Sequence, residues 1–415
     1  MPCKRCGGRQ RARKSCATAR GVTWKRNSTL KLSRRRWSGS MSSLRNRHGM
    51  RELSIVQPYV PRYRVAFFDG LAQALRDDDV RLRVIAGEPT KSQKARGDAA
   101  TAEWLETVAP RIVEIGGRHL SLTYSRSLWR GSEAVIVPHQ GSSLDAVSAL
   151  ARRGETRVGV WGHIASYTSP LNVVDGLVER WQLRRAHHVF AYTPGGAEFA
   201  RNTGVSPRNI TTVMNTIDSD ELLRALDQLS VAGARAALSE RGVPDAPYLA
   251  YIGGLDESKR IRFLAESLDI AHRRGIDVHI VVLGRGDQAE LLGRAVARGQ
   301  VTRLGYGGVT DKAAVLRGAR AVVNPGRVGL LAVDCLAART PLITTDWPWH
   351  APELEYLRGG SLAKLVADDA GTFAETMGVA MRGAPSHPAE DWPHPPRLRD
   401  MVANFQRGVR SMLDG

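Results

Sequence analysis

The chain has 415 residues, of which 42% are apolar and 24% are charged, the composition of a globular protein with room for two or three domains. No window approaches the roughly 18 uninterrupted apolar residues of a membrane-spanning helix, which excludes a bundle of such helices. The formal net charge of +19 would suggest a nucleic-acid partner if it were spread over the whole fold.

The positive charge is concentrated at the start of the chain. Residues 1–49 hold 15 of the 60 lysines and arginines and no aspartate or glutamate. From position 50 onward, 45 basic residues face 41 acidic ones, a balance of only +4. Residues 50–415 therefore give no electrostatic reason to expect nucleic acid as a partner.

The basic segment 1–49 is poor in large apolar residues, so we expect it to be disordered. An over-long start assignment, with Met50 as the true start, is the simplest explanation; an organelle transit peptide and a tail that binds nucleic acid or membrane are the alternatives. Cys3 and Cys6 could begin a zinc site, but no second ligand pair follows at the usual spacing. Only Cys335 lies beyond this segment, which favours a reducing, cytoplasmic location.

From position 54 onward, β-rich runs alternate with helical stretches, which is typical of parallel sheets covered by helices on both faces. The strands expected in the first half are 54–57, 82–86, 112–115, 134–138, 158–161, 189–192 and 210–214.

Glycine and proline at 242–247 mark a linker before a second half with the same alternation. Its expected strands are 248–252, 278–283, 321–324 and 342–344, and an amphipathic helix at 397–412 should pack back on the first half. The sequence therefore predicts an α/β protein with two doubly wound domains, 50–230 and 245–395, and a returning helix at 396–415. Ligands of such sheets bind at the carboxyl ends of the strands, so we expect the site in a cleft between the domains.

Two glycine turns follow expected strands of the second half. Gly253 and Gly254 precede Lys259 at the start of a helix, and Gly284 ends the next strand. Such turns let backbone amides approach an anion at a helix N-terminus, with the lysine adding a point charge. Neither turn has the spacing of a P-loop or of a dinucleotide fingerprint.

A third segment, Asn324-Pro-Gly-Arg-Val-Gly-Leu330, leads into a helix that carries Asp334. Together the three segments resemble the nucleotide-sugar domain of glycosyltransferase family 4, and the resemblance covers position 50 to the C-terminus. It implies the GT-B fold, a nucleoside diphosphate sugar as donor and retention of the anomeric configuration.

The resemblance implies roles for several residues. The family holds the donor diphosphate with a Gly-Arg-Leu turn and a lysine five residues after the arginine; here Lys259 matches and Gly254 replaces the arginine. The family also places two glutamates eight residues apart, the first on the donor sugar and the second on the ribose. Asp334 corresponds to the second and Gly326 to the first.

Some branches of the family resemble this Pro-Gly-x-Val-Gly-Leu form. Arg327 would then replace the missing diphosphate cation, since a guanidinium binds phosphate in bidentate fashion, or it would be an ordinary surface arginine. Val328, Gly329 and Leu330 complete the expected donor turn.

Other candidates lie outside these turns. Glu353, in a Pro-Glu loop like that of the family, is our candidate for the missing sugar contact. His163 follows an expected strand where the family has a functional histidine, although a lone histidine is more often structural. Arg62, Tyr63 and Arg64 follow the first strand, where the family's loop approaches the acceptor; a solvated loop is the alternative.

These residues predict a retaining, metal-independent glycosyltransferase with His163 and Lys259 as catalytic residues and no cofactor. We interpret Asp218 and Asp220 as helix caps instead of a metal-binding Asp-x-Asp motif. The acceptor would be a glycan, a lipid-linked molecule or a small molecule, as in polysaccharide biosynthesis, with a transient position on the inner face of a membrane. A sugar-nucleotide epimerase of the same fold and a non-catalytic sugar-nucleotide binder are the alternatives.

Overall fold

The computed structural model describes residues 50–415 except 89–99, 110, 116–117, 123–125, 153, 155, 168–171, 359–361 and 384–391. The described residues all belong to one unit, His48–Gly415. The basic segment 1–49, with Cys3 and Cys6, lies outside the described residues, so the expectations for this segment stay predictions. In the part of the chain that is described, no helix has both the length and the apolar character needed to cross a membrane.

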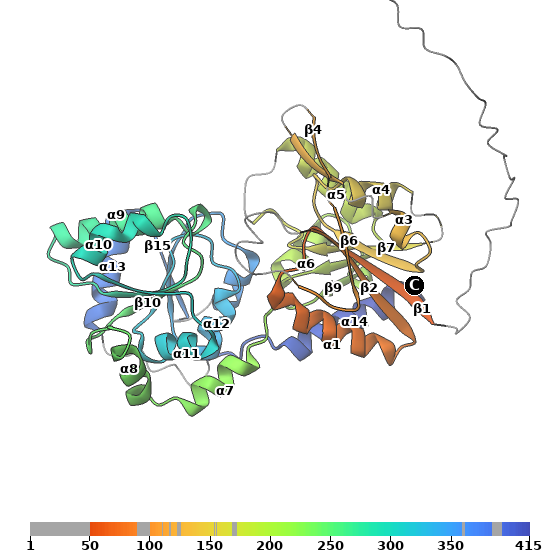
Figure 1. Ribbon diagram of the computed structural model, residues 1–415. Helices are drawn as coiled ribbons and strands as arrows, with labels where there is room; N and C mark the ends of the chain where they lie inside the picture. Colours follow the sequence, from red (N-terminus) through yellow and green to blue (C-terminus); the bar gives the residue numbers. More distant parts are fainter. Residues whose placement is uncertain are drawn as a thin grey trace, which may run out of the picture. The chain divides into compact units, whose positions relative to one another are not determined.

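A seven-stranded parallel sheet forms the first half of the fold (Figure 1). Its order is β3-β2-β1-β6-β7-β8-β9. The bounds are β1 (Arg51–Gln57), β2 (Val80–Gly87), β3 (Leu105–Val108), β6 (Ala134–Pro138), β7 (Arg157–Gly162), β8 (His188–Ala191) and β9 (Ile210–Thr212).

Helices cover both faces of this sheet, because successive side chains of a strand point to opposite faces. Ile55 packs with α1 (Val65–Arg76) and α14 (Leu398–Asp414) on one face. Its neighbour Val56 packs on the other face, which is covered by α3 (Arg126–Trp129), α4 (Leu144–Ala151), α5 (Val173–Arg185) and α6 (Pro194–Asn202).

The last helix returns to the first sheet, as the amphipathic pattern predicts. Phe405 of α14 is fully buried, and its ring stacks on that of Phe190 in β8 with 4.5 Å between centroids. The rings of Phe67 and Trp161 also contact it. The C-terminal helix is therefore part of the core of the first half.

A six-stranded parallel sheet forms the second half, in the order β12-β11-β10-β13-β14-β15. Its core again alternates: Leu249 packs with α9 (Ile261–Arg273), α10 (Gly293–Ala297) and α13 (Ala370–Arg382), and Ala250 with α11 (Val309–Gly318) and α12 (Leu331–Ala338). The strands are β10 (Leu249–Ile252), β11 (Ile280–Leu283), β12 (Val301–Gly305), β13 (Val322–Val323), β14 (Leu342–Thr345) and β15 (Ala363–Val366).

Two helices, α7 (Asp220–Gln228) and α8 (Val231–Ser239), precede the second sheet. Asp218 accepts a hydrogen bond from the Asp220 amide at the start of α7, at 3.1 Å. The acidic pair therefore lies at a helix N-terminus, as expected for caps. The short 3-10 helices are η1 (Arg62–Arg64), η2 (Pro207–Asn209), η3 (Glu257–Lys259), η4 (Ala289–Leu292) and η5 (Pro352–Leu357).

One expected strand of the main sheet was placed wrongly. The run 112–115 forms β4 (Arg111–Ile115), which pairs antiparallel with β5 (Arg118–Leu122) in a separate hairpin. Alternating apolar residues predict a strand but not its partner, and here only two residues separate β4 from β5, which favours a local hairpin.

Both sheets reverse their strand order at one point, between β1 and β6 in the first and between β10 and β13 in the second. Open parallel sheets bind ligands at the carboxyl ends of the strands beside such a reversal. The segments after β1, β10 and β13 contain many of the residues that the sequence singles out.

Candidate active site

The turns after β10 and β11 pack backbone against backbone. The amides of Gly253 and Leu255 donate to the carbonyls of Leu283 at 3.1 Å and Arg285 at 2.9 Å. A Cβ on Gly284 would lie 1.9 Å from the Gly253 carbonyl oxygen, so no larger residue fits there. These glycines fix one turn against the next, and the two amides are engaged within the protein.

The turn after β13 packs on η3 just as closely. The Arg327 amide donates to the Ser258 carbonyl at 2.8 Å, and the Lys259 Nζ donates to the Arg327 carbonyl. A Cβ on Gly326 would lie 2.4 Å from the carbonyl carbon of Lys259. The glutamate that the family has at this position therefore could not be accommodated by this backbone.

Lys259 lies where these segments meet at the reversal of the second sheet. Burial lowers the pKa of its ammonium to about 8; Arg327 lowers the pKa further, and Asp256 and Glu353 raise it. Two cations and two carboxylates therefore act on one another at this point. A ligand with a negative charge would relieve the unfavourable pairing of the cations.

The loop that carries Glu353 is tied to the β13 turn by a buried histidine. His350 Nδ1 accepts from the Val328 amide at 3.2 Å, and its Nε2 donates to the Thr345 carbonyl at 2.9 Å. These partners assign the neutral tautomer with the proton on Nε2. The Ala351 amide also donates to the Val328 carbonyl, at 2.7 Å.

The carboxylate of Glu353 is 97% buried and accepts a hydrogen bond from the Asn215 side chain. Burial raises the pKa of Glu353, while Asn215 and the Arg64 cation lower it. A Cβ on Gly329 would lie 3.8 Å from Glu353 Oε2, in ordinary contact. The structure thus places Glu353 beside the expected donor turn.

Asp334 forms an ion pair that the sequence did not indicate. Its two oxygens accept from Lys312 Nζ of α11, at 3.0 and 2.9 Å. Burial raises the pKa of Asp334 and Lys312 opposes that shift. The ammonium can donate three hydrogen bonds and each carboxylate oxygen has two lone pairs, so the pair retains capacity for ligand hydroxyls.

His163 directly follows β7, at the carboxyl end of the strand as expected. Its ring lies edge-on to that of Tyr192, with 5.0 Å between centroids. Burial lowers the pKa of His163 to about 4, and the cations Arg64 and Arg327 lower it as well. The imidazole is therefore neutral at pH 7 and lacks the second proton that an imidazolium donates as a general acid.

Arg64 is the buried member of η1. It is 6% exposed, and its guanidinium lies over the rings of Tyr63, Trp161 and Tyr192 at 5.4, 5.4 and 5.5 Å. These residues line a cavity of about 310 Å³. Arg62 and Tyr63 are exposed, so of the three expected acceptor-side residues only Arg64 is deeply buried.

Five side chains thus form one electrostatic cluster, in which the charge of each side chain affects the pKa of another member or its own pKa is affected by one. They are His163, Lys259, Arg327, Glu353 and Arg64. Sequence reasoning did not identify Asn215, which bonds Glu353, His350, which bonds the Val328 amide, or Lys312, which pairs with Asp334. Among the described residues, no three His, Cys, Asp or Glu side chains gather as metal ligands would.

Comparison with known proteins agrees with this architecture. Residues 246–382 match the family model described as Glycosyl transferases group 1. No curated protein sequence matches the chain significantly.

Solved structures resemble the chain over most of its length. UDP-GlcNAc 2-epimerase from Methanocaldococcus jannaschii, in complex with UDP-GlcNAc and UDP, is 14% identical with a TM-score of 0.56, covering 88% of this chain and 100% of that one. Alr3699/HepE from Anabaena, in complex with UDP, is 13% identical with a TM-score of 0.54, covering 88% of this chain and 98% of that one. A glycosyltransferase from Rickettsia africae is 12% identical with a TM-score of 0.55, covering 88% of this chain and 97% of that one.

At these identities the likeness shows the fold, which is GT-B. The family model and these folds support a place in the GT-B glycosyltransferase superfamily.

Proposed function

We propose that the chain is a retaining glycosyltransferase that moves a sugar from a nucleoside diphosphate donor to an acceptor hydroxyl. In this reaction the bond between the sugar's anomeric carbon and the diphosphate breaks, a bond to the acceptor oxygen forms, and the acceptor loses a proton. Retention of configuration rests on the resemblance to family 4.

The observation that carries the proposal is the position of Lys259. Its Nζ bonds the Arg327 carbonyl across the reversal of the second sheet, and both side chains act electrostatically on each other. Negative charge develops on the departing diphosphate, so fixed cations there stabilise the transition state more than the ground state. Two fold neighbours were solved in complex with UDP, which supports a nucleoside diphosphate as part of the donor.

The other residues take supporting roles in this proposal. Glu353 would accept hydrogen bonds from donor-sugar hydroxyls, the part that Gly326 is unable to play. Asp334, with Lys312, would bind the ribose. Neutral His163 would orient the transferred sugar or the acceptor by hydrogen bonding.

An epimerase is the second candidate, because one of the solved structures is a UDP-GlcNAc 2-epimerase with a TM-score of 0.56. The two activities differ in what happens to the donor alone. An epimerase converts it to an isomer of the same mass, whereas a transferase without acceptor leaves it intact or slowly hydrolyses it.

The test is incubation with single UDP, GDP, ADP and dTDP sugars, in EDTA, followed by mass spectrometry and chromatography. We expect one donor to be hydrolysed slowly to free sugar and nucleoside diphosphate, and EDTA to leave this rate unchanged because Lys259 and Arg327 supply the positive charge.

A new isomer would identify an epimerase, and thermal protection without turnover would identify a binder. Activity that returned only with magnesium or manganese would refute metal independence.

A further inference from the structure

The cavity of about 310 Å³ around Arg64 lies at the carboxyl end of β1, beside the reversal of strand order in the first sheet. Open parallel sheets bind ligands at this place. Its volume is at the lower end of the range for small-molecule sites, which suits one cyclic unit better than an extended chain. Five aromatic side chains line it, namely Tyr59, Tyr63, Phe68, Trp161 and Tyr192.

Arg64 is the only charged side chain among the described residues that line this cavity, and it is buried without an anionic partner. Its hydrogen-bond partners are neutral: the Tyr192 hydroxyl at 3.4 Å, the Met401 sulfur at 4.0 Å and the Tyr63 hydroxyl. No carboxylate of the described residues forms an ion pair with it. Buried charges are normally paired, and the cation–π contacts of Arg64 offset part of this cost. The guanidinium, with five N–H donors, therefore retains capacity for an anionic ligand.

Glu353 is the carboxylate whose charge reaches Arg64. Burial lowers the pKa of Arg64, whereas the neighbouring tyrosines and Glu353 raise it. Glu353 nevertheless forms no ion pair with Arg64 and accepts a hydrogen bond from the Asn215 side chain. Its charge thus offsets part of the charge of Arg64 but takes none of the N–H groups of the guanidinium.

A second donor in the wall of the cavity lacks an acceptor. Trp161 is 3% exposed, and its indole N–H has no hydrogen-bond partner among the described residues. The ring of Trp161 contacts those of Phe68 and Tyr192, which also line the cavity. A buried N–H without a partner costs free energy, which a ligand oxygen would recover. A ligand that fills this cavity must therefore supply acceptors.

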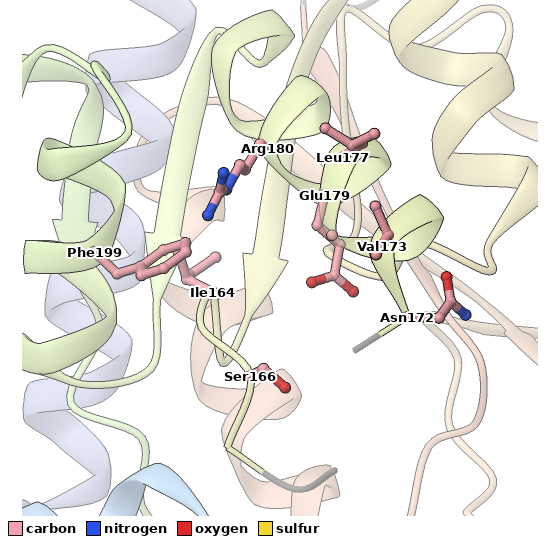
Figure 2. A pocket seen from close by; sticks show the side chains of 9 residues that line it. Ile164, Ser166, Asn172, Val173, Leu177, Glu179, Arg180 and Phe199 are labelled. Carbon is pink, nitrogen blue, oxygen red and sulfur yellow. The ribbon is translucent and has the colours of Figure 1, made fainter. Parts of the chain in front are cut away.

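The cavity of about 370 Å³ beside α5 differs in its charge (Figure 2). Glu179 and Arg180 both line it, so a carboxylate offsets the cation there. That cavity gives no electrostatic reason to select an anion. Arg180 is therefore a suitable control for a test of Arg64.

The charge and the ring faces around Arg64 together match an acidic sugar. A carboxylate carries one negative charge, which matches one guanidinium, whereas a phosphate monoester carries about −1.5 to −2 at pH 7. The planar fork of an arginine also binds a carboxylate in bidentate fashion. Sugar oxygens can accept from the Trp161 N–H, and the apolar C–H face of a sugar ring can pack on the aromatic rings of the wall.

We propose that this cavity binds the acidic unit of the acceptor, a sugar that carries a carboxylate, with Arg64 paired to the carboxylate and the Trp161 N–H bonded to a sugar oxygen. This rests on the proposed function and narrows it, because the acceptor is then an acidic glycan or glycoside. Tyr192 links the cavity to the candidate active site, since its hydroxyl accepts from Arg64 and its ring lies 5.0 Å from that of His163.

The test is a titration of the full chain with methyl β-glucuronide, without donor, followed by ligand-observed NMR, which measures weak affinities. Methyl β-glucuronide should bind at least about tenfold more tightly than methyl β-glucoside, which has a neutral hydroxymethyl group in place of the carboxylate. This comparison uses only the unmodified chain, so it decides even if a variant fails to fold.

Two pairs of variants test the contacts. Arg64→Met should weaken methyl β-glucuronide about tenfold and leave methyl β-glucoside unchanged, whereas Arg180→Met should change neither. Tyr63 is 46% exposed, and Tyr63→Ala should weaken both glycosides because it removes a ring face from the cavity. Tyr306, which is 73% exposed and lies outside this cavity, is the matched control, and Tyr306→Ala should weaken neither.

Equal affinity for the two glycosides, or binding of neither, would overturn the proposal, as would glucuronide binding that Arg64→Met and Tyr63→Ala leave unchanged. Tighter binding of glucose 6-phosphate, or displacement of the glucuronide by pyrophosphate, would indicate a phosphate site and overturn it too. The proposed function fails separately. Glucuronide binding without turnover of any nucleotide sugar would refute only the transferase, and transfer to a neutral acceptor without glucuronide binding would refute only the acidic acceptor.

Discussion

Single residues at this site are tuned by burial more than by direct pairing. Burial is the largest cause of the fall in the pKa of Lys259 to about 8; Arg327 lowers the pKa further, and the hydrogen bond that Lys259 donates goes to a neutral carbonyl. Such a lysine is still largely protonated at pH 7. It gains most from a ligand that brings negative charge.

A pH profile should reveal this lysine. The charged form of Lys259 is present below pH 8 and is lost above it, so kcat/KM for the donor should fall as pH rises from 7.5 to 9.5, approaching tenfold per pH unit. Lys259→Arg keeps its charge over this range and should lose that decline, even if its rate is lower. A flat profile in the unmodified enzyme, or the same decline in the arginine variant, would contradict this role.

The sequence identifies residues that sit in a local motif and misses residues that act through tertiary contacts. Lys259 and Asp334 have characteristic spacings from the glycine turns that precede them. Lys312 lies on an ordinary helical stretch, and only the packing of α11 beside α12 brings it to Asp334. Likewise, nothing near Asn215 in the sequence indicates its bond to Glu353.

At the scale of elements, the donor turns depend on glycines for close approach. Gly284 and Gly326 both face backbone atoms at distances that exclude a Cβ. The sequence predicted Gly284 as part of an anion cradle and Gly326 as the position where the family has a glutamate. In the structure their first role is to let three turns pack together, which in turn positions Lys259 and Arg327.

Two glycines of one turn provide a matched test. In Gly326→Ala the new Cβ would meet the Lys259 backbone at 2.4 Å, so something must shift, whereas in Gly329→Ala its nearest neighbour would be 3.5 Å away. We expect Gly326→Ala to lower the free energy of unfolding by about 1–3 kcal/mol. Gly329→Ala should change it far less. Urea denaturation measures both, and equal effects would mean that close packing at 326 is not what requires glycine.

Central strands were predictable, whereas three of the four edge strands of the two parallel sheets were not. Ala134–Pro138 and Leu249–Ile252 are apolar runs buried on both faces. The missed strands β3, β12 and β15 lie at or near sheet edges and keep polar, partly exposed residues such as Glu106, Arg303 and Lys364. These strands form because they pair with the neighbouring strand of the sheet, and their own sequences lack an apolar pattern that would predict a strand.

For the molecule as a whole, buried neutral histidines link stability to pH. Burial lowers the pKa of His139, His163 and His188 to about 4 each. The unfolded chain, with histidine pKa values near 6.5, binds these protons first as pH falls. Folded stability from these groups is therefore complete above about pH 6.5 and is lost as pH falls toward 4.

We expect the free energy of unfolding to fall by up to about 1.4 kcal/mol per pH unit for each such histidine between pH 6 and 4.5. His188 is 1% exposed, so protonating it in the folded state costs free energy. Glutamine does not titrate in this range, so His188→Gln should reduce the slope. The exposed His272 is the control, and His272→Gln should leave the slope unchanged. Chemical denaturation at several pH values decides; a slope that His188→Gln does not alter would refute the linkage.

The central claim is that the leaving diphosphate lies against Lys259, and one substitution tests it most directly. Removing one preorganised electrostatic partner costs about 3–4 kcal/mol, so Lys259→Ala should lower kcat for the donor found by screening roughly 100- to 1000-fold. Lys364→Ala, which removes an exposed lysine in β15, should keep full turnover. Both variants should keep the melting temperature of the parent without ligand, while stabilisation by nucleoside diphosphate should shrink only in Lys259→Ala. If Lys259→Ala keeps more than about a third of the parent turnover, where the mechanism requires a hundredfold loss, the leaving group does not lie at this turn.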